Sequence, residues 1–490
     1  MKQSRQMEFE DVQGIVRFAY NHLKRAGFLL LQVKNREAAR EWLKTAPVTN
    51  AVKLVPPPKR TLQIALSSQG LGALGVADAI VQGFSVEFVA GMSGDANRSS
   101  RLGDIGESDP GHWQWGSAPN NMPHVLVMLY AEPDDFEQWQ QQILEQCAAG
   151  FTVIDKLDTE VMNGREPFGF IDGISQPDID WQGERVTHYQ QEIEYTNLSC
   201  LGEFLLGYSN EYSGYTGRPL LDEQSEGASN LPKAEDAPDK ADLGRNGTYL
   251  VFRHLKQDVR QFWRFMDAQA GGDAARRQHL AEAMVGRTLP EGKPLAALTD
   301  KGLNDFDYQG DSQGFKCPFG AHIRRANPRN PDLPSGQPGW LAWLWRNLGF
   351  DAKARRKDIV ASTRFHRLLR RGRKYGKSLS IDQALTPAEA NEESGLYFIC
   401  LNSSIVRQFE FVQTAWIMGT RFDGLNREGD PLLGHRQPDL AGAPSDGFSI
   451  PQADAPDEKL CGLPRFITVR GGAYFFLPGI RALRYLVSTS

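Results

Sequence analysis

The sequence predicts an α+β protein built from two ferredoxin-like halves, each with helices packed on an antiparallel sheet in a split β-α-β arrangement. Strand-like and helical segments alternate in the order β-α-β, β-α-β in the first third of the chain, and segments of the same kinds return later. The chain has 490 residues, which exceeds what one hydrophobic core usually supports. We therefore expect two or more core units.

The first half is predicted from the period of its apolar residues. Two runs, "GFLLLQV" and "TLQIALSS", are typical of strands, and "REAAREWLKTA" between them is typical of a helix. A second set of strand, helix and strand follows. In chain order, the predicted elements are strand 27–33, helix 36–46, strand 61–68, strand 123–131, helix 134–150 and strand 151–157.

The second half is predicted from the same signals, after a stretch from about 208 to 246 that is rich in Gly, Ser, Pro and Asp. Its elements are strand 247–255, helix 258–271, strand 394–404, helix 405–417 and strand 473–479. We place the first half at 1–207, a polar connecting segment at 208–246 and the second half at 247–490.

Composition excludes several classes of function. Hydrophobic residues make up 40% of the chain and charged residues 23%, which is ordinary for a globular protein. A formal net charge of −5 gives no attraction to nucleic acid or to an anionic membrane. The five cysteines form no C-x-x-C pair, which argues against a disulfide framework or a structural zinc site and favours a reducing compartment. The first residues are not apolar and the apolar runs are too short to cross a bilayer, so we expect a cytoplasmic protein.

One glycine motif favours a different function. Gly70, Gly72 and Gly75 form a G-x-G-x-x-G pattern after a strand-like segment, as in dinucleotide-binding folds where glycines let the backbone approach a pyrophosphate. Such a fold needs a parallel β-α-β unit with an acidic residue at the end of the next strand. The next strand-like segment offers only an embedded Glu87. Nucleotide binding is therefore the weaker alternative to glycines that merely begin a helix.

An aspartate stands in an otherwise apolar run at residues 167–177, "PFGFIDGISQP". The glycines at 169 and 173 permit a tight turn around Asp172, and the prolines at both ends limit how far the loop can relax. We infer a rigid loop that holds the carboxylate in place.

A histidine lies on a second irregular segment, "KCPFGAHIRRANPRNP", residues 316–331. His322 is followed by an Asn-Pro step that discourages a continued helix. Lone histidines are more often surface or core residues than ligands. Without a His-x-x-x-His partner, a single imidazole suits an iron held by four porphyrin nitrogens better than a zinc site, which needs three or four protein ligands. Cys317 is a rival axial ligand, and we favour the imidazole.

A third stretch, "RFHRLLRRGRKYG" at residues 364–376, is strongly basic around a Leu-Leu pair. Its arginines and lysines are most simply a solvated face, and one arginine that points inward is the alternative.

These three stretches, in this order and spacing, resemble the dye-decolorizing peroxidases, which are haem enzymes built from two ferredoxin-like halves. The first stretch contains the family's GxxDG signature. The resemblance covers nearly the whole chain and includes its opening "DVQGIVRFAYNHLKRAGFLLLQV" and its close "RGGAYFFLPGIRALRYL". The length and the polar middle segment are similar to those of the larger C/D-type members.

The resemblance implies the main residues of an active site. It makes His322 the proximal iron ligand, Asp172 the distal acid/base and Arg370 the distal cation. Arg371 is the alternative to Arg370, which is favoured because it directly follows the Leu-Leu pair. The implied cofactor is haem b (iron protoporphyrin IX), in a pocket mainly within the C-terminal half.

Four further residues receive supporting roles from the resemblance. Glu410 is implied as the acidic partner of His322, and Arg329 as the partner of a haem propionate. Leu396 and Phe398 are implied to cover the distal face of the haem. An exposed helical glutamate and a core strand are the alternatives for Glu410 and for the apolar pair.

The implied activity is oxidation of bulky aromatic compounds (dyes, phenols and aromatic amines) by hydrogen peroxide, in one-electron steps through a ferryl haem. An aspartate base favours activity in acid, because the ordinary pKa of an aspartate is about 3.9 and that of an imidazole about 6.5. A haem-handling protein with little peroxidase turnover is the alternative. The implied partners are hydrogen peroxide and aromatic reductants, without nucleic acid or membrane insertion, and homo-oligomer formation is left open.

Overall fold

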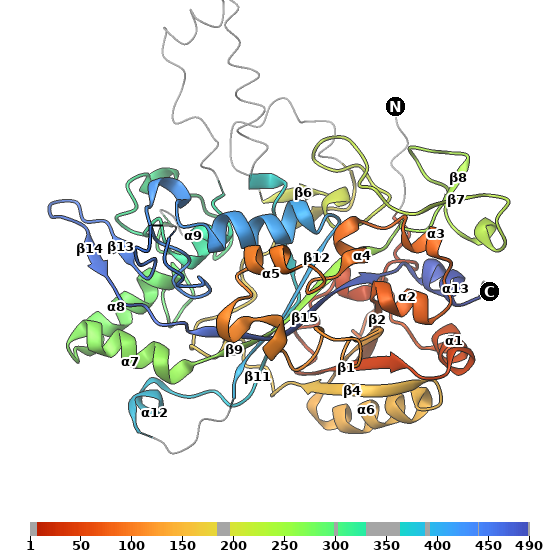
Figure 1. The fold of residues 1–490 in the computed structure, drawn as a ribbon, viewed down its shortest axis with the longest axis horizontal. Helices are drawn as coiled ribbons and strands as arrows, with labels where there is room; N and C mark the ends of the chain where they lie inside the picture. Colours follow the sequence, from red (N-terminus) through yellow and green to blue (C-terminus); the bar gives the residue numbers. More distant parts are fainter. Residues whose placement is uncertain are drawn as a thin grey trace, which may run out of the picture.

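The computed structural model describes residues 7–183, 197–297, 302–329, 363–387, 393–439 and 441–488. The predicted 316–331 stretch therefore lies within the described residues only up to 329. Figure 1 shows two groups of strands and helices that meet in one continuous sheet.

The first half forms the six elements that the sequence predicts, in the predicted order. They are β1 (Arg25–Val33), α1 (Arg36–Thr45), β2 (Arg60–Leu66), β3 (Val125–Ala131), α6 (Pro133–Cys147) and β4 (Phe151–Asp158). The side chain of Asn35 caps α1, and α6 begins at a proline, whose missing N–H has no partner to lose there. Four short helices lie between β2 and β3: α2 (Ser68–Ala73), α3 (Asp78–Val81), α4 (Val86–Ala90) and α5 (Ala96–Leu102).

The second half also contains its predicted elements. Its sheet strands are β9 (Thr248–Gln257), β10 (Leu369–Arg370), β11 (Arg373–Tyr375), β12 (Gly395–Asn402) and β15 (Ile467–Leu477). Its helices are α7 (Val259–Ala270), α8 (Ala274–Val285), α9 (His322–Ala326), α12 (Ile381–Leu385) and α13 (Ile480–Ser488). The helix predicted at 405–417 is wound as a π-helix in two stretches, η8 (Val406–Glu410) and η9 (Val412–Met418).

Three small two-stranded sheets complete the described elements. They pair β5 (Asp178–Asp180) with β6 (Leu198–Cys200), β7 (Leu220–Asp222) with β8 (Lys240–Asp242), and β13 (Phe448–Ile450) with β14 (Glu458–Leu460).

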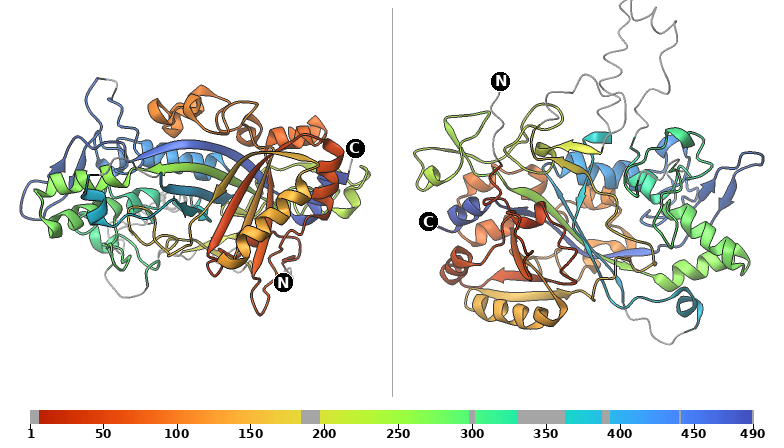
Figure 2. Two further views of the ribbon diagram at one scale, coloured as in Figure 1. Left: turned by 90° about the horizontal axis from the view of Figure 1, so that it is seen from below. Right: turned by 180° about the vertical axis from the view of Figure 1, so that it is seen from behind.

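The two halves share a nine-stranded sheet in the order β10-β12-β9-β15-β2-β3-β1-β4, with β11 also paired to β12. All pairings in it are antiparallel. Within each half the strand order is second-third-first-fourth, which is the ferredoxin-like order. The halves join where β15 meets β2, at the pair Phe476 and Leu66. The predicted fold class is thereby confirmed, and Figure 2 shows how strongly the shared sheet twists.

Strand β1 shows how the core is organised. Leu29 and Leu31 belong to one apolar cluster, and Phe28 and Leu30 belong to another. Because side chains alternate along a strand, the two clusters lie on opposite faces of the sheet. Each cluster contains residues of both halves, so the core divides by sheet face and not by chain half. The predicted boundaries at 207 and 246 remain our proposal.

The glycine motif serves packing. A side chain at Gly70 would place its Cβ 2.0 Å from the carbonyl oxygen of His124, so only glycine fits there. The N–H of Gly70 is also bonded to the Oγ of Ser67, which caps α2. The motif follows β2, whose neighbour β3 is antiparallel, and a dinucleotide site needs a parallel β-α-β unit. The nucleotide alternative therefore fails.

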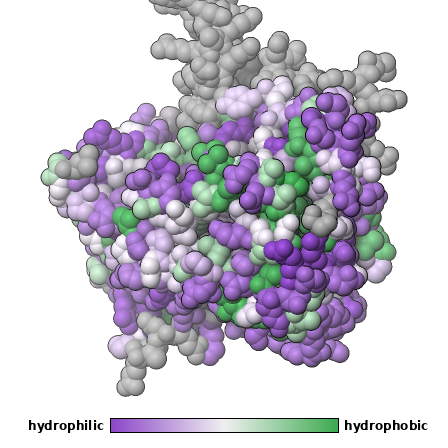
Figure 3. All heavy atoms as spheres, turned by 45° about the vertical axis from the view of Figure 1, so that its right-hand side comes forward, coloured by the Kyte–Doolittle hydropathy of each residue, from purple (hydrophilic) through white to green (hydrophobic). Residues whose placement is uncertain are grey.

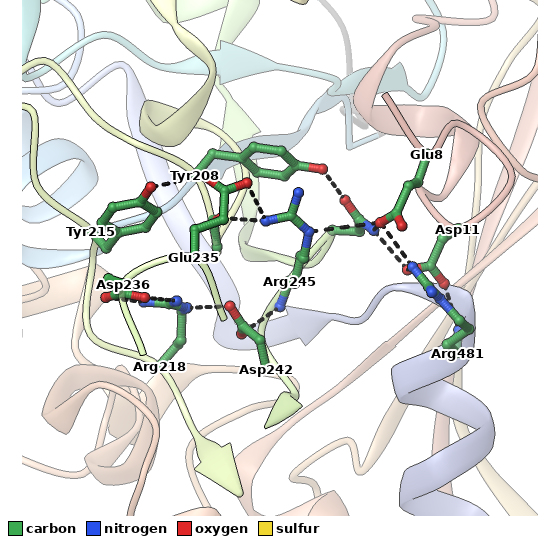
Figure 4. A network of polar contacts seen from close by, with 12 residues as sticks. Glu8, Asp11, Tyr208, Tyr215, Arg218, Glu235, Asp236, Asp242, Arg245 and Arg481 are labelled. Carbon is green, nitrogen blue, oxygen red and sulfur yellow. Dashed lines mark hydrogen bonds and ion pairs between the residues drawn. The ribbon is translucent and has the colours of Figure 1, made fainter. Parts of the chain in front are cut away.

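Ion pairs and hydrogen bonds of charged side chains stabilise the polar segment 208–246 (Figure 4). Arg218 contacts Asp242 at 2.7 Å and Asp236 at 2.5 Å. Arg245 contacts Glu235 at 2.8 Å and lies over the ring of Tyr208, 4.2 Å from its centroid. These contacts fold the segment onto itself.

The same network reaches both ends of the described chain. Asn246 donates to Asp11 at 2.7 Å and to Glu8 at 2.9 Å. Arg481, on α13, contacts Glu8 at 2.8 Å and Asp11 at 3.1 Å (Figure 4). The segment thus ties the N-terminal residues to the last helix.

Hydrophilic side chains cover most of the face shown in Figure 3, with apolar side chains scattered among them. None of the helices in the described ranges has the length and apolar character needed to cross a membrane.

Replacement of Arg218 by alanine should lower the melting temperature clearly. Its ion partner Asp242 has a side chain that is 0% exposed, and one-sided loss of a buried pair costs about 3–5 kcal/mol. Lys233→Ala, in the same segment, removes an exposed pair with Glu223 and should cost at most about 1 kcal/mol. Thermal unfolding followed by circular dichroism compares the two variants. Equal melting temperatures would show that the Arg218 pair does not stabilise the fold.

Candidate active site

A cavity of about 250 Å³ lies where the two halves meet. The prediction places the pocket mainly in the C-terminal half, and most residues that line this cavity do follow residue 247. The first half contributes the loop that carries Asp172 and the end of α5. The second half contributes residues of β9, α9, β12, β15 and the π-helix η8–η9.

The loop around Asp172 has the backbone shape that its glycines permit. Gly169 and Gly173 have φ angles of 104° and 78°, in the left-handed region that favours glycine. The N–H of Asp172 donates to the carbonyl of Gly164 at 3.0 Å, and its Oδ1 accepts from the N–H of Gly173 at 2.6 Å. Arg165 holds the loop by donating to the carbonyl of Gly169 at 2.7 Å. The loop is therefore rigidly hydrogen-bonded, as its sequence predicts.

Strand β10 brings Arg370 to the cavity. Arg370 pairs with Cys400 in the antiparallel ladder between β10 and β12. Directly opposite residues share a face of the sheet, and residues two apart along a strand do too, so Arg370 lies on the same face as Leu396 and Phe398. All three side chains line the cavity.

An ion pair joins the two halves inside the cavity. A terminal nitrogen of Arg370 lies 3.2 Å from Oδ1 of Asp172, and the side chains are 32% and 34% exposed. The other terminal nitrogen of Arg370 donates to the carbonyl of Ser175 at 3.2 Å, and its backbone N–H donates to Oε1 of Gln176 at 2.9 Å. The arginine thus binds the aspartate and the loop that carries it.

The structure separates Arg370 from its neighbour. Arg371 points to the other face of the sheet, where its Nε donates to the carbonyl of Ile15 at 2.7 Å. Burial lowers the pKa of Arg371 to about 10. Arg371 is a buried structural residue, and Arg370 is the arginine that lies in the cavity.

His322 is the first residue of α9 and lines the same cavity. Its Nδ1 lies 2.9 Å from Oδ2 of Asp430, whose side chain is fully buried. A carboxylate only accepts, so Nδ1 of His322 donates this hydrogen bond. Within the described part of the chain no hydrogen bond involves Nε2, and His322 is 28% exposed. Nε2 therefore presents its lone pair to the cavity when the ring is neutral.

Asp430 is held as a carboxylate by its surroundings. Its Oδ1 accepts from the N–H groups of Leu432 and Leu433, each at 2.9 Å. Burial raises the pKa of Asp430, but the charge and hydrogen bond of His322 and the charge of Arg325 outweigh burial, so the pKa lies below its ordinary value.

The prediction that Glu410 is the acidic partner of His322 is wrong. Glu410 lies on η8, where its Oε1 contacts Nε of Arg98 at 3.0 Å and accepts from the hydroxyl of Tyr474 at 2.9 Å. The side chain is about 10% exposed, so the alternative of an exposed helical glutamate is wrong as well. The carboxylate that His322 contacts is Asp430.

Arg329 does not line the cavity in the described structure. One terminal nitrogen donates to the carbonyls of Asn304 at 3.0 Å and Phe306 at 2.8 Å, and the other donates to Oδ1 of Asn304 at 3.1 Å. The guanidinium lies 3.7 Å from the centroid of the Phe306 ring. These donors are used by protein groups, so the structure does not support the predicted role at a haem propionate.

Cys317, the rival ligand, is fully buried outside the cavity lining. Burial raises the pKa of its thiol to about 12, which disfavours the thiolate that binds metals. Among the described residues there is no group of three or more His, Cys, Asp or Glu side chains that could hold a metal ion. Two imidazoles line the cavity among the described residues, those of His322 and His366. The ring of His366 stacks on Phe411 with 3.6 Å between centroids and its Nδ1 contacts the carbonyl oxygen of Arg407, whereas His322 is backed by a carboxylate.

The sequence interpretation missed three residues of this site. Asp430 lies 108 residues after His322, and no local pattern links them. Glu166 lines the cavity beside Asp172 and accepts two backbone hydrogen bonds of the loop. Arg287 donates to Oγ of Ser175 at 2.7 Å and so supports the same loop. Of the three, only Glu166 could have been found from the sequence, because it is a charged residue that directly precedes the apolar, glycine-containing stretch 167–177.

The chain is similar to known proteins over most of its length. No family model matches the chain. A dye-decolorizing peroxidase of Mycetinis scorodonius is 25% identical over 88% of this chain and 77% of its own length. A multifunctional dye peroxidase of an Amycolatopsis species is 32% identical over 49% of this chain and 49% of its own length.

Solved structures agree with the sequence relatives. A DyP-type peroxidase of Anabaena has a TM-score of 0.71 at 23% identity, over 98% of this chain and 94% of that chain. A fungal DyP-type peroxidase from Auricularia auricula-judae has a TM-score of 0.71 at 22% identity, over 99% of this chain and 100% of that chain. The predicted resemblance to dye-decolorizing peroxidases is confirmed over most of the chain, and with it the prediction of an oxidoreductase.

The contact between His322 and Asp430 predicts a definite tautomer. In ¹⁵N NMR spectra of histidine-labelled protein, neutral His322 should carry its proton on Nδ1, because only that nitrogen faces the Asp430 carboxylate. Asp430→Asn should change the His322 nitrogen shifts. Glu410→Gln should leave them in place, because Glu410 contacts Arg98 and Tyr474 instead. The reverse pattern would contradict this assignment.

Proposed function

We propose that this chain is a haem peroxidase of the dye-decolorizing type, which uses hydrogen peroxide to oxidise bulky aromatic compounds by one-electron steps. The observation that carries the proposal is that one cavity contains an aspartate–arginine ion pair and an imidazole whose Nε2 has no hydrogen bond among the described residues. The relatives named above are dye peroxidases, which supports the same reaction class.

The residues of the cavity fit a haem. Its walls include Leu396 and Phe398 on β12 and many other apolar side chains, as a porphyrin requires. When its ring is neutral, His322 offers Nε2 as a ligand backed by a carboxylate, which would suit an iron that a porphyrin already holds through four nitrogens. We propose haem b bound through His322 Nε2, with Asp430 giving the imidazole partial imidazolate character.

Haem, when bound, supplies the redox centre that peroxide oxidises and that aromatic donors reduce. Asp172 would act as the acid/base: it takes a proton from one oxygen of hydrogen peroxide and returns it to the other, so that water leaves. Arg370 would stabilise the negative charge that develops on the oxygens, a preorganised contribution. The ordered loop holds Asp172 at the cavity wall.

Leu396 and Phe398 would limit the water and the size of molecule that reach this site, because both line the cavity next to Arg370. Bulky aromatic donors are then proposed to give up their electrons without entering it. We also propose the cytoplasm as the compartment, since the five cysteines, all among the described residues, form no disulfide and four of them are buried.

Asp172→Asn should bind haem as wild type does but react with peroxide about 10²–10⁴ times more slowly, the usual effect of losing a general acid/base. Stopped-flow absorbance after mixing haem-loaded protein with peroxide measures this rate. Asp178→Asn, an exposed carboxylate just beyond the loop, is the matched control and should react normally. A wild type that only bleaches slowly under peroxide would instead indicate a haem-handling protein.

A further inference from the structure

The loop that carries Asp172 contains a second carboxyl group, Glu166, which lines the same cavity. Its Oε1 accepts from the N–H of Phe170 at 2.9 Å, and its Oε2 accepts from the N–H of Phe168 at 2.9 Å. Gln257, the last residue of β9, donates its Nε2 to Oε2 at 2.8 Å. Glu166 therefore ties the backbone of the Asp172 loop to the central sheet.

Gln257 can serve both charge states of Glu166. Its Oε1 is buried and has no hydrogen-bond partner among the described residues. A half-turn of the side-chain amide exchanges its oxygen and nitrogen. In one orientation Nε2 donates to an ionised Glu166, and in the other Oε1 accepts the proton of a neutral Glu166.

We propose that Glu166 is a positioning residue for Asp172 whose charge also controls proton transfer in the cavity: ionised Glu166 favours it and neutral Glu166 does not. This inference rests on the proposed peroxidase function. In the step concerned, hydrogen peroxide gives one proton to the Asp172 carboxylate, which leaves a hydroperoxide anion and a neutral Asp172. One negative charge thereby moves from Asp172 to the peroxide. An ionised Glu166 repels the Asp172 carboxylate, and so favours this movement.

The surroundings of Glu166 place its ionisation near neutral pH. Burial raises the pKa of Glu166 to about 7, and the charge of Asp172 raises it further, while the hydrogen bonds from Phe168, Gln257 and Phe170 oppose the rise. Lys374, on β11, is the cation whose own pKa responds to Glu166. Because the pKa is raised, Glu166 is neutral below about pH 7 and ionises as the pH rises through it.

The rate of the peroxide reaction of haem-loaded protein should therefore rise as the pH rises through about 7. In Glu166→Gln this inflection should disappear, and the rate above it should remain close to its low-pH value. Glu166→Asp keeps an ionisable carboxyl and should keep an inflection. Glu160→Gln is the matched control, because Glu160 is exposed and also acts on Lys374, and it should match wild type.

An infrared titration of the haem-free protein supplies a readout that does not depend on activity. The band of protonated carboxyl groups should weaken as the pH rises through about 7 in wild type. Glu203, whose pKa burial also raises to about 7, contributes equally to wild type and Glu166→Gln. The difference between the two titrations therefore reports Glu166.

Each outcome decides a separate claim. An inflection that persists in Glu166→Gln, or identical infrared titrations, overturns the role of Glu166 and leaves the peroxidase proposal intact. No reaction of haem-loaded wild type with peroxide at any pH overturns the peroxidase proposal and this inference with it. If Glu166→Gln fails to fold, Gln257→Leu decides: it removes a donor to the carboxylate and should move the inflection to higher pH, and an unmoved inflection overturns the role.

Discussion

The pairing of β10 with β12 determines which arginine enters the cavity, and the chemistry of the site depends on it. Arg370 lies opposite Cys400, so it shares a face with Leu396 and Phe398. A slip of one residue would exchange the faces of Arg370 and Arg371. The register is held from both faces of the sheet, because Arg371 donates to backbone carbonyls of residues 15 and 16 while Arg370 binds the Asp172 loop.

The sheet also explains how distant residues come to share one cavity. β15 of the second half pairs with β2 of the first half, so the sheet is continuous. The loop of Asp172 contacts the second half through Gln257 and Arg370. Several charged groups in this apolar space have an ion partner: Asp172 has Arg370, His322 has Asp430, and Arg253 has Asp104. Glu166 and Arg287 are held by hydrogen bonds. Paired charges are what a buried site requires, since an isolated buried charge is strongly destabilising.

Sequence patterns predicted the features that depend on residues close together in the chain. The alternation of strands and helices predicted the fold. The resemblance to the dye-decolorizing peroxidases implied Asp172, His322 and Arg370, three residues that the structure brings into one cavity. The partner of His322 could not be predicted in this way, because it depends on where the chain returns at residues 428–434. Glu410 sits on a π-helix, whose wider turns shift side chains from the positions expected for a regular helix.

The central claim is that His322 would hold a haem iron in the cavity that the Asp172–Arg370 pair also lines. Absorbance spectra of haem-loaded wild type and His322→Ala test it most directly, with His279→Ala, an exposed histidine on α8, as the control. We predict a stable haem spectrum in wild type and His279→Ala, and loss of stable iron ligation in His322→Ala with the fold intact by circular dichroism. An unchanged haem spectrum in His322→Ala would contradict the account.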